Sequence, residues 1–332
     1  MHGAIAANNL NHIHHTKNGF TNPWMNDEDY LRIRDRIQWR LQNFIVNPRP
    51  RSRRYSIPAL DYRDIKIQER YNSTALTWVG HSTYLIQIDD VNILTDPVWS
   101  SLVGPGNKIG PRRKSNPGIP WHKLPNIDVV LISHTHYDHL DKPTVMRLRK
   151  EFNPLFIVPL GVKAELAKWN ITNVQERDWW YSIKHNGIQF ICTPAQHTSR
   201  RGLFDVDETL WSGWLISGQD ETVYFAGDTG YFPEFQRVAN HSPRQIDVAI
   251  LPIGAYKPRW YMRYMHMDPY DALRAYRELN ARYFAGMHWG AFDVADENID
   301  EPPKELSRAA NSFEISDNGL WMLALGETRI IT

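Results

Sequence analysis

The sequence predicts a layered α/β domain, in which short strands and helices alternate along the chain. From residue 75 onward, runs of β-branched and other apolar residues end at turn-forming residues, and helical patterns lie between several of these runs. Two predicted strands also resemble each other, since residues 126–132 read NIDVVLI and residues 245–251 read QIDVAIL. Each follows a strand that runs into an aspartate, Asp96 or Asp228. This similarity could be a coincidence between two buried strands. Otherwise it predicts two βαβ-type halves packed face to face, with their loops meeting at one edge.

The composition of the 332-residue chain excludes several classes of protein. Its 42% hydrophobic and 23% charged residues are typical of a globular fold that needs no cross-links. Cys192 is the one cysteine, which excludes a disulfide framework and favours a reducing compartment. No apolar stretch approaches the roughly 20 residues that span a bilayer, and the first residues do not resemble a signal peptide. The net charge of +1 argues against a globally basic nucleic-acid binder.

The first 54 residues differ from the rest of the chain. Residues 1–25 lack apolar periodicity and are expected to form a flexible arm ahead of one domain that spans residues 26–332. A helix is predicted over residues 27–46, because Asn26 can cap it and apolar residues recur at every fourth position. Eight arginines and one aspartate lie between residues 30 and 54. This basic segment is either a solvated helix face or a surface that meets the anionic phosphates of lipid or nucleic acid.

Strands and helices are predicted in alternation after residue 75. The predicted strands span residues 75–79, 84–88, 91–94, 128–132, 155–158, 189–192, 215–216, 223–225 and 247–251. The predicted helices span residues 144–152, 162–169, 231–238 and 269–279. The last helix has the clearest start, since Asp268 is a good capping residue and Pro269 suits the first helical position.

Histidines and aspartates cluster directly after the predicted strand 128–132, in the sequence SHTHYDHLD. Within six residues the cluster holds His134, His136, Asp138 and His139. Imidazole nitrogens and carboxylate oxygens are ligands of Zn²⁺ and similar divalent ions. Tight spacing lets the first two histidines point one way while Asp138 and His139 point another. The loop therefore predicts ligands for two metal ions.

One loop cannot complete two coordination shells, but single histidines or aspartates also follow three other apolar runs. These residues are His197, Asp228 and His288. Each alone could equally be a polar residue at a strand end. Together with the loop they make seven side chains, and a bridging Asp228 would give four bonds to each ion. The first ion would take His134, His136, His197 and Asp228. The second would take Asp138, His139, His288 and Asp228.

This arrangement favours hydrolysis of a phosphodiester. Two divalent ions about 3.5–4 Å apart can share a hydroxide that is nucleophilic at neutral pH. Because two carboxylates and one hydroxide do not fully neutralise two such ions, a positive charge is left over. That charge suits a monoanionic phosphodiester and the negative charge that its transition state gathers.

The ligand order resembles the metallo-β-lactamase superfamily. The pattern is His134-x-His136-x-Asp138-His139, followed by His197, Asp228 and His288. Further blocks are similar to the N-acyl-phosphatidylethanolamine-hydrolysing phospholipase D family, from about Phe20 to near the C-terminus. These blocks are GHST (80–83), TDP (95–97), FAGDTGY (225–231), PIGAYKPRW (252–260), HMDP (266–269), HWG (288–290) and EPPK (301–304).

This resemblance implies an αββα four-layer sandwich that holds two zinc ions per subunit and forms a homodimer. It implies that a metal-bridging hydroxide splits N-acyl-phosphatidylethanolamine into N-acylethanolamine and phosphatidic acid. The implied metal ligands are His134, His136, Asp138, His139, His197, Asp228 and His288. The implied catalytic residues are Asp138, Asp228 and His266. Asp96 and His81 match positions that orient metal-bound histidines.

Other functions share these ligands and stay open at this stage. The same metal pair serves nucleases as well as lactonases and other ester hydrolases, although the chain shows no RNA-binding module. Residues 259–267, rich in methionine, aromatic residues and arginine, form either a packed loop or a lipid-binding wall. We expect a phospholipid substrate at a membrane surface, no nucleic-acid partner, and a cytoplasmic protein with peripheral membrane association.

Overall fold

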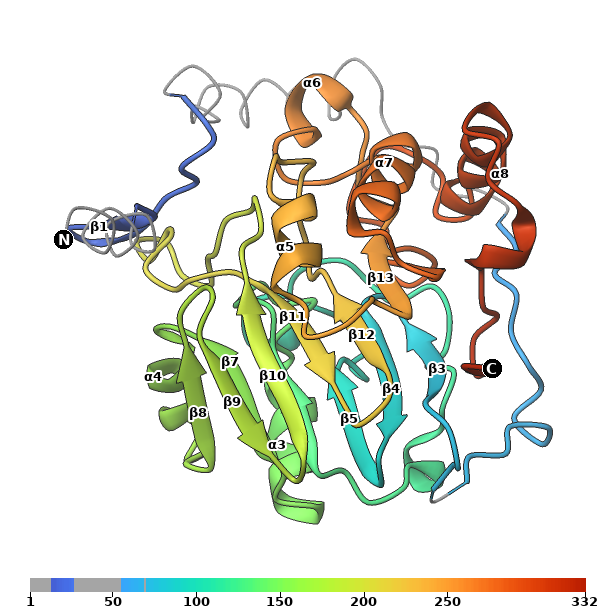
Figure 1. Ribbon diagram of the computed structural model, residues 1–332. Helices are drawn as coiled ribbons and strands as arrows, with labels where there is room; N and C mark the ends of the chain where they lie inside the picture. Colours follow the sequence, from blue (N-terminus) through green and yellow to red (C-terminus); the bar gives the residue numbers. More distant parts are fainter. Residues whose placement is uncertain (1–12, 27–54, 69) are drawn as a thin grey trace, which may run out of the picture.

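Two seven-stranded sheets pack face to face in the computed structural model, and helices cover the outer face of each sheet (Figure 1). The structure describes residues 13–26, 55–68 and 70–332. The layers follow the order helix, sheet, sheet, helix. This order confirms the predicted αββα sandwich.

The first sheet is antiparallel on one side and parallel on the other. In sheet order its strands are β16 (Thr328–Ile330), β3 (Ala75–Gly80), β4 (Thr83–Ile88), β5 (Val91–Thr95), β6 (Val129–Leu131), β7 (Leu155–Pro159) and β8 (Val174–Arg177). Pairing is antiparallel from β16 to β5 and parallel from β5 to β8.

The second sheet repeats this pattern of strand directions. In sheet order its strands are β9 (Ser182–His185), β10 (Ile188–Thr193), β11 (Gly213–Ser217), β12 (Thr222–Phe225), β13 (Val248–Pro252), β14 (Tyr283–Met287) and β15 (Leu320–Trp321). Pairing is antiparallel from β9 to β12 and parallel from β12 to β15. The two segments that resemble each other in sequence are β6 and β13, the fifth strand of each sheet. The predicted two-half architecture is therefore confirmed.

The helices form the two outer layers. Figure 1 shows α3 (Lys142–Glu151) and α4 (Val162–Ala167) on one side, and α5 (Phe235–His241), α7 (Pro269–Leu279) and α8 (Pro302–Ser312) on the other. Shorter turns are η2 (Pro105–Asn107), η3 (Trp121–Lys123), α6 (Arg259–Met262) and η4 (Asp317–Gly319). Among the described helices, none is both long and apolar enough to cross a membrane.

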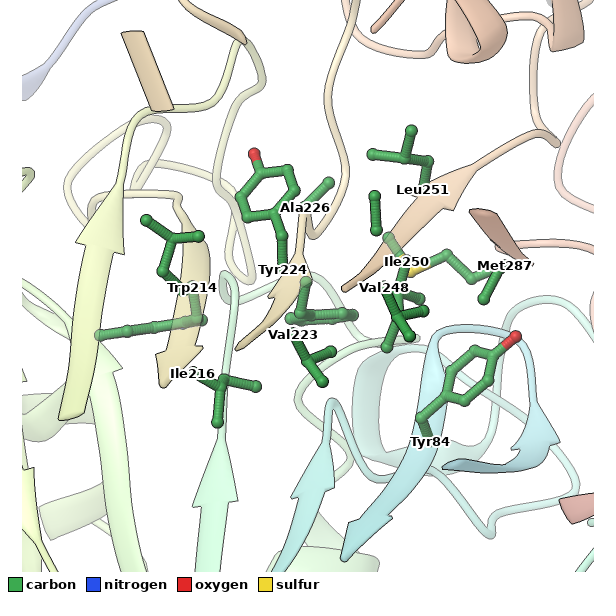
Figure 2. Close-up of a cluster of buried hydrophobic side chains, with 14 of the residues drawn as sticks. Tyr84, Trp214, Ile216, Val223, Tyr224, Ala226, Val248, Ile250, Leu251 and Met287 are labelled. Carbon is green, nitrogen blue, oxygen red and sulfur yellow. The ribbon is translucent and has the colours of Figure 1, made fainter. Parts of the chain in front are cut away.

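Side chains of the first sheet alternate between two cores, because successive residues of a strand point to opposite faces. In β4, Tyr84 and Ile86 enter the core between the sheets, whereas Leu85 packs under α3 and α4. Figure 2 shows Tyr84 close to Val248 and Met287 of the second sheet. Burial of such a side chain contributes about 1.5–3 kcal/mol. The period-two pattern thus decides which face each strand presents.

Two hydrogen bonds join the sheets inside this apolar core. The Tyr84 hydroxyl donates to the carbonyl of Gly286 at 2.8 Å, and Trp214 Nε1 donates to the carbonyl of Ile132 at 2.9 Å. Both aromatic side chains are fully buried. Because an unpaired buried polar group is costly, these bonds favour one alignment of the two sheets.

All nine predicted strands and the four helices predicted after residue 75 are present; α7 has the predicted ends, and the ends of the others are shifted. The largest shift is at the helix predicted over 231–238, which begins at Phe235, because Pro233 disfavours helical geometry in the residue before it. The elements β8, β9, β14, β15, β16 and α8 were not predicted. Asp268 caps α7 as predicted, since its side chain accepts from the Asp271 N–H.

The prediction of a flexible arm over residues 1–25 is wrong for the part that the structure describes. Residues 13–26 form a small hairpin of β1 (His15–Thr16) and β2 (Gly19–Phe20), and this segment is docked on the domain. His14 is buried, and its Nε2 lies 2.7 Å from Asp178 Oδ1. Residues 1–12 and the predicted basic helix 27–46 lie outside the described residues.

Trp214→Phe tests the tie between the sheets. The change removes the donor to the Ile132 carbonyl while it keeps an aromatic ring in place. We expect a loss of about 1–3 kcal/mol in the free energy of unfolding, measured by chemical denaturation. The control is Trp260→Phe at a side chain that is 43% exposed. Equal stability of the two variants would contradict a stabilising role for this bond.

Candidate metal centre

The predicted ligands meet at one edge of the sandwich, where strands from both halves end. His134, His136, Asp138 and His139 follow β6, whereas His197, Asp228 and His288 follow β10, β12 and β14. All seven lie in a buried or partly buried cluster. The structure therefore brings together every residue that the sequence analysis assigned to metal binding.

Strained turns at the strand ends direct side chains into this cluster. His81, Asp96 and His288 directly follow β3, β5 and β14, and all three have a left-handed backbone, with φ of 54°, 33° and 62°. Such a conformation costs of the order of 1–3 kcal/mol in a residue other than glycine. Backbone hydrogen bonds hold these turns, since His288 N–H donates to the His81 carbonyl and Asp96 N–H to the Leu131 carbonyl.

Gly227 lets Asp228 approach the loop after β6. Its φ is +61°, and a Cβ on it would lie 2.6 Å from Ser133 Cβ and 2.7 Å from the Ser212 carbonyl oxygen. Both distances are too short for any larger residue. The glycine in FAGDTGY is therefore required by this close approach.

Three histidines form one group of ligand atoms. His136 Nδ1 lies 2.8 Å from His134 Nε2 and 3.2 Å from His197 Nε2. The atoms converge from two separate loops, after β6 and after β10. Three imidazoles in this arrangement could hold one cation.

A second group combines histidines with a carboxylate. Asp138 Oδ2 lies 3.8 Å from both His139 Nε2 and His288 Nε2. His81 Nε2 lies 3.1 Å from the same oxygen, and the His81 ring also packs at a tilt against the His288 ring, with centroids 4.2 Å apart. This group could hold a second cation.

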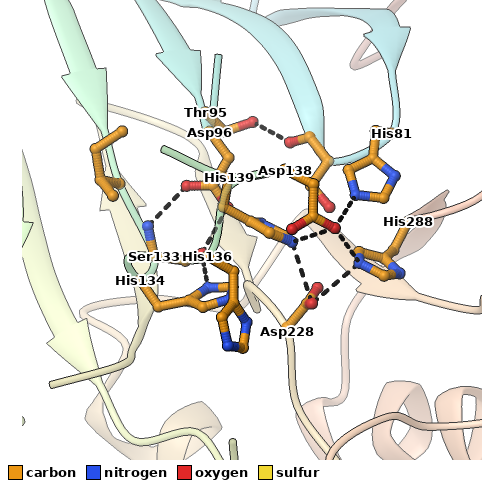
Figure 3. Close-up of polar contacts among 12 residues, drawn as sticks. His81, Thr95, Asp96, Ser133, His134, His136, Asp138, His139, Asp228 and His288 are labelled. Carbon is orange, nitrogen blue, oxygen red and sulfur yellow. Dashed lines mark hydrogen bonds and ion pairs between the residues drawn. The ribbon is translucent and has the colours of Figure 1, made fainter. Parts of the chain in front are cut away.

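Asp228 lies between the two groups. Its Oδ2 is 3.1 Å from His139 Nε2, 3.0 Å from His288 Nε2 and 3.8 Å from His197 Nε2. Figure 3 shows the carboxylates of Asp138 and Asp228 on either side of the His139 and His288 nitrogens. Because Asp228 is reached from both groups, it is suited to bridge two cations.

Asp96 orients the ligands without facing the centre itself. Its carboxylate accepts from the N–H and the hydroxyl of Ser133, at 2.7 and 2.5 Å, and lies 2.7 Å from His139 Nδ1. The Ser133 hydroxyl also lies 2.9 Å from His134 Nδ1. With Nδ1 engaged, Nε2 of each ring faces the cluster. This supports the orienting role expected for Asp96; the role of Ser133 was not predicted.

Two of the histidines have the protonation state that metal ligands need, which is a neutral imidazole with a free lone pair. Burial lowers the pKa of His136 to about 3 and that of His197 to about 4, so both imidazoles are neutral. Burial opposes ionisation of Asp228, but His139 and His288 outweigh it and hold the pKa of this carboxyl well below its usual range. Burial also opposes a charge on His139, yet the three carboxylates around it raise its pKa well above the usual value. The carboxylates therefore favour positive charge at the centre of the cluster.

Several buried ligand atoms have no hydrogen-bond partner among the described residues. They are Asp228 Oδ1, His139 Nε2 and His288 Nε2, and the two nitrogens contact Asp228 Oδ2 only as ion pairs, at 3.1 and 3.0 Å. Buried polar atoms without a hydrogen bond are rare in folded proteins and are costly unless a ligand or a charged neighbour satisfies them. Because all three belong to one cluster of nitrogen and oxygen donors, the residues fit divalent cations.

Arg201 contacts both ends of the loop that carries most of the ligands, and no local sequence pattern predicted this role. Its Nη1 donates to the carbonyls of Thr135 and Leu140, at 2.8 and 2.7 Å. Its guanidinium lies 4.2 Å from the ring centroid of Tyr137, whose hydroxyl donates back to the Arg201 carbonyl. One partly buried side chain thus fixes both ends of the loop.

Residues 259–267 form a packed loop, which was one of the two alternatives. Its buried side chains include Tyr261, Met262 and Met265. The guanidinium of Arg259 pairs with Asp271 at 2.5 Å, and the Met265 carbonyl lies 3.0 Å from His197 Nδ1.

The loop also carries His266, which is 9% exposed, with Nδ1 3.9 Å from Asp228 Oδ2. The predicted catalytic histidine therefore lies beside the metal centre.

Comparison with known proteins agrees with this geometry. Residues 91–289 match the model of the beta-lactamase superfamily domain. The chain is 40% identical over 248 residues to an uncharacterized protein of Mycobacterium tuberculosis, covering 73% of this chain and 65% of that one, a little under two thirds. It is 36% identical over 265 residues to N-acyl-phosphatidylethanolamine-hydrolyzing phospholipase D 1 of Caenorhabditis elegans, covering 76% and 74%. A possible metal-dependent hydrolase of Veillonella parvula has a similar fold, with a TM-score of 0.61 at 19% identity over 78% of this chain and 99% of that one.

Asp96→Asn tests the support beneath His139. Asparagine keeps the size of the side chain but offers an amide donor where Ser133 or His139 also donates. We expect one cation to bind about 10–100-fold more weakly, measured by competition with a chelator of known affinity. Asp90→Asn, at the exposed turn before β5, is the matched control. Unchanged affinity in a folded Asp96→Asn protein would show that Asp96 does not support the ligands.

Proposed function

The chain belongs to the beta-lactamase superfamily and, within it, to the N-acyl-phosphatidylethanolamine-hydrolysing phospholipase D family, and we propose that it is a dizinc phosphodiesterase acting on phospholipid headgroups. The observation that carries this proposal is the position of Asp228 between two groups of ligand atoms. The name of the nematode relative supports N-acyl-phosphatidylethanolamine as the substrate.

The proposed ligand sets follow the two groups in the structure. One cation takes His134, His136, His197 and Asp228. The other takes Asp138, His139, His288 and Asp228. Imidazole and carboxylate donors without cysteine suit zinc, although other divalent ions accept them too. Two bound zinc ions would lower the pKa of water between them and so supply a nucleophile near neutral pH.

His266 is proposed to act on the substrate itself. Its Nδ1 is buried, lies near Asp228 and has no hydrogen-bond partner among the described residues. Burial lowers the pKa of this imidazole well below its usual value, so the ring is neutral. A neutral imidazole can donate a hydrogen bond to the phosphate or to the leaving oxygen. The negative charges of Asp138 and Asp228 complement the positive charge of the cations and so keep the centre assembled.

The setting of the reaction follows from its substrate. A phospholipid lies in a membrane, so we propose that the chain acts at a membrane surface as a peripheral protein. Assembly as a homodimer, a cytoplasmic location and the absence of a nucleic-acid partner stay predictions.

Elemental analysis of the purified protein tests the metal content. We expect close to two divalent ions per chain, mainly zinc. Asp228→Ala removes the carboxylate shared by both sets and should lose at least one ion and the activity. Asp220→Ala, at an exposed turn, is the control and should keep both ions. A fully active protein without metal would overturn the proposal.

An isotope experiment separates attack at phosphorus from attack at a carbonyl. Hydrolysis at phosphorus forms a bond between phosphorus and the water oxygen and breaks the bond from phosphorus to the ethanolamine oxygen. In ¹⁸O-water, an N-acyl-phosphatidylethanolamine should therefore yield labelled phosphatidate and unlabelled N-acylethanolamine, as measured by mass spectrometry. Label in a free fatty acid would instead assign the chain to the ester hydrolases of this fold. Cleavage of RNA but not of lipid would assign it to the nucleases.

A further inference from the structure

Asn22 connects the N-terminal hairpin segment, residues 13–26, to the backbone of His197. The side-chain Nδ2 donates to the His197 carbonyl at 2.8 Å, and Oδ1 accepts from the His197 N–H at 3.1 Å. Asn22 is 3% exposed and His197 is 1% exposed. One buried amide thus pairs with both backbone groups of a predicted metal ligand, as a neighbouring strand would do.

These two bonds matter because His197 lies in an irregular loop. No strand or helix covers residues 194–212, between β10 and β11, so no sheet ladder satisfies the backbone there. Buried backbone groups need partners, and Asn22 supplies both for this residue. A separate contact orients the ring, since Nδ1 lies 3.0 Å from the Met265 carbonyl. Nε2 is then left facing His136 and Asp228.

The hairpin segment is itself fixed to the domain by several contacts. His14 Nε2 and His15 Nε2 lie 2.7 and 2.8 Å from the two oxygens of Asp178. Phe20 N–H donates to the Asp207 carbonyl at 2.8 Å. Trp24 stacks on Trp179 and also packs against Phe232, with ring centroids 5.6 and 4.9 Å apart. Residues before and after Asn22 in the sequence are therefore both fixed to the domain, and they hold Asn22 in place.

We propose that Asn22 is a positioning residue of the metal centre, which holds the His197 backbone so that Nε2 meets its cation. The inference rests on the proposed function for the identity of the ligands. It makes residues 13–26 part of the working site, although they precede the ligand loop by more than a hundred residues. Asn22 acts through His197 and does not touch the substrate.

Two variants test the proposal. Asn22→Ala removes both bonds. Asn22→Asp keeps an acceptor for the His197 N–H but sets an oxygen against the His197 carbonyl, so it removes one bond. Binding of one cation should weaken about 10–100-fold in Asn22→Ala and at least as much in Asn22→Asp, whose buried carboxylate repels the His197 carbonyl, while the second cation keeps its wild-type affinity. Asn18→Ala, at the exposed turn of the same hairpin, should bind both cations normally.

The readouts are stepwise chelator competition and the visible absorption of the Co²⁺-substituted protein. A misplaced imidazole should change the cobalt spectrum of one site and leave that of the other unchanged. Activity lost at limiting zinc should return with excess zinc. Equal weakening of both cations together with a lower melting temperature would mean that Asn22 only stabilises the fold, and this would overturn the inference. Wild-type affinities in both variants would overturn it as well.

These outcomes differ from a failure of the proposed function. If the wild-type protein binds two cations but cleaves another substrate, the affinities of the Asn22 variants still decide this inference. If the wild-type protein cleaves the phospholipid and the variants match it in metal binding, this inference alone fails.

Discussion

A buried carboxylate surrounded by imidazoles is the constraint on which the rest of this structure depends. Asp228 is nearly inaccessible to solvent, and moving an isolated charge out of water costs several kcal/mol even after relaxation. His139 and His288 offset this cost from two different strand ends. Their positions require the two sheets to end at one edge in a fixed alignment. The inter-sheet bond of Trp214 helps to hold that alignment, and the left-handed turn at His288 points its ring toward Asp228.

The two halves repeat the same strand pattern, yet they divide the chemistry unequally. Asp96 and Asp228 follow β5 and β12, which occupy the same place in their sheets. Both oxygens of Asp96 contact Ser133 or His139, so this carboxylate is already paired within the protein. Asp228 keeps one oxygen without a hydrogen-bond partner among the described residues. One half thus contributes a support and the other a ligand from equivalent positions.

Local sequence patterns predicted many of the strands and the residues of the candidate metal centre. Alternating apolar residues indicated strands such as β4, and a short loop with three histidines indicated a metal centre. By contrast, β14 reads YFAGM, which lacks the β-branched residues that mark a strand, and it becomes one through pairing on both sides. Asn22 and Arg201 contact carbonyls 175 and 66 residues away along the chain. No local pattern reports a contact between a side chain and so distant a backbone group.

The position of β16 has a consequence for how the chain is made. Its Thr328 pairs with Thr77 of β3, 251 residues earlier, so one side of β3 stays without its neighbour until β16 has been synthesised. At roughly 5–20 residues per second, that interval lasts on the order of 10–50 s. An unpaired strand edge is a template for pairing with other chains. The first sheet is therefore exposed to aggregation on the ribosome for most of translation, and chaperone binding during that interval would protect it.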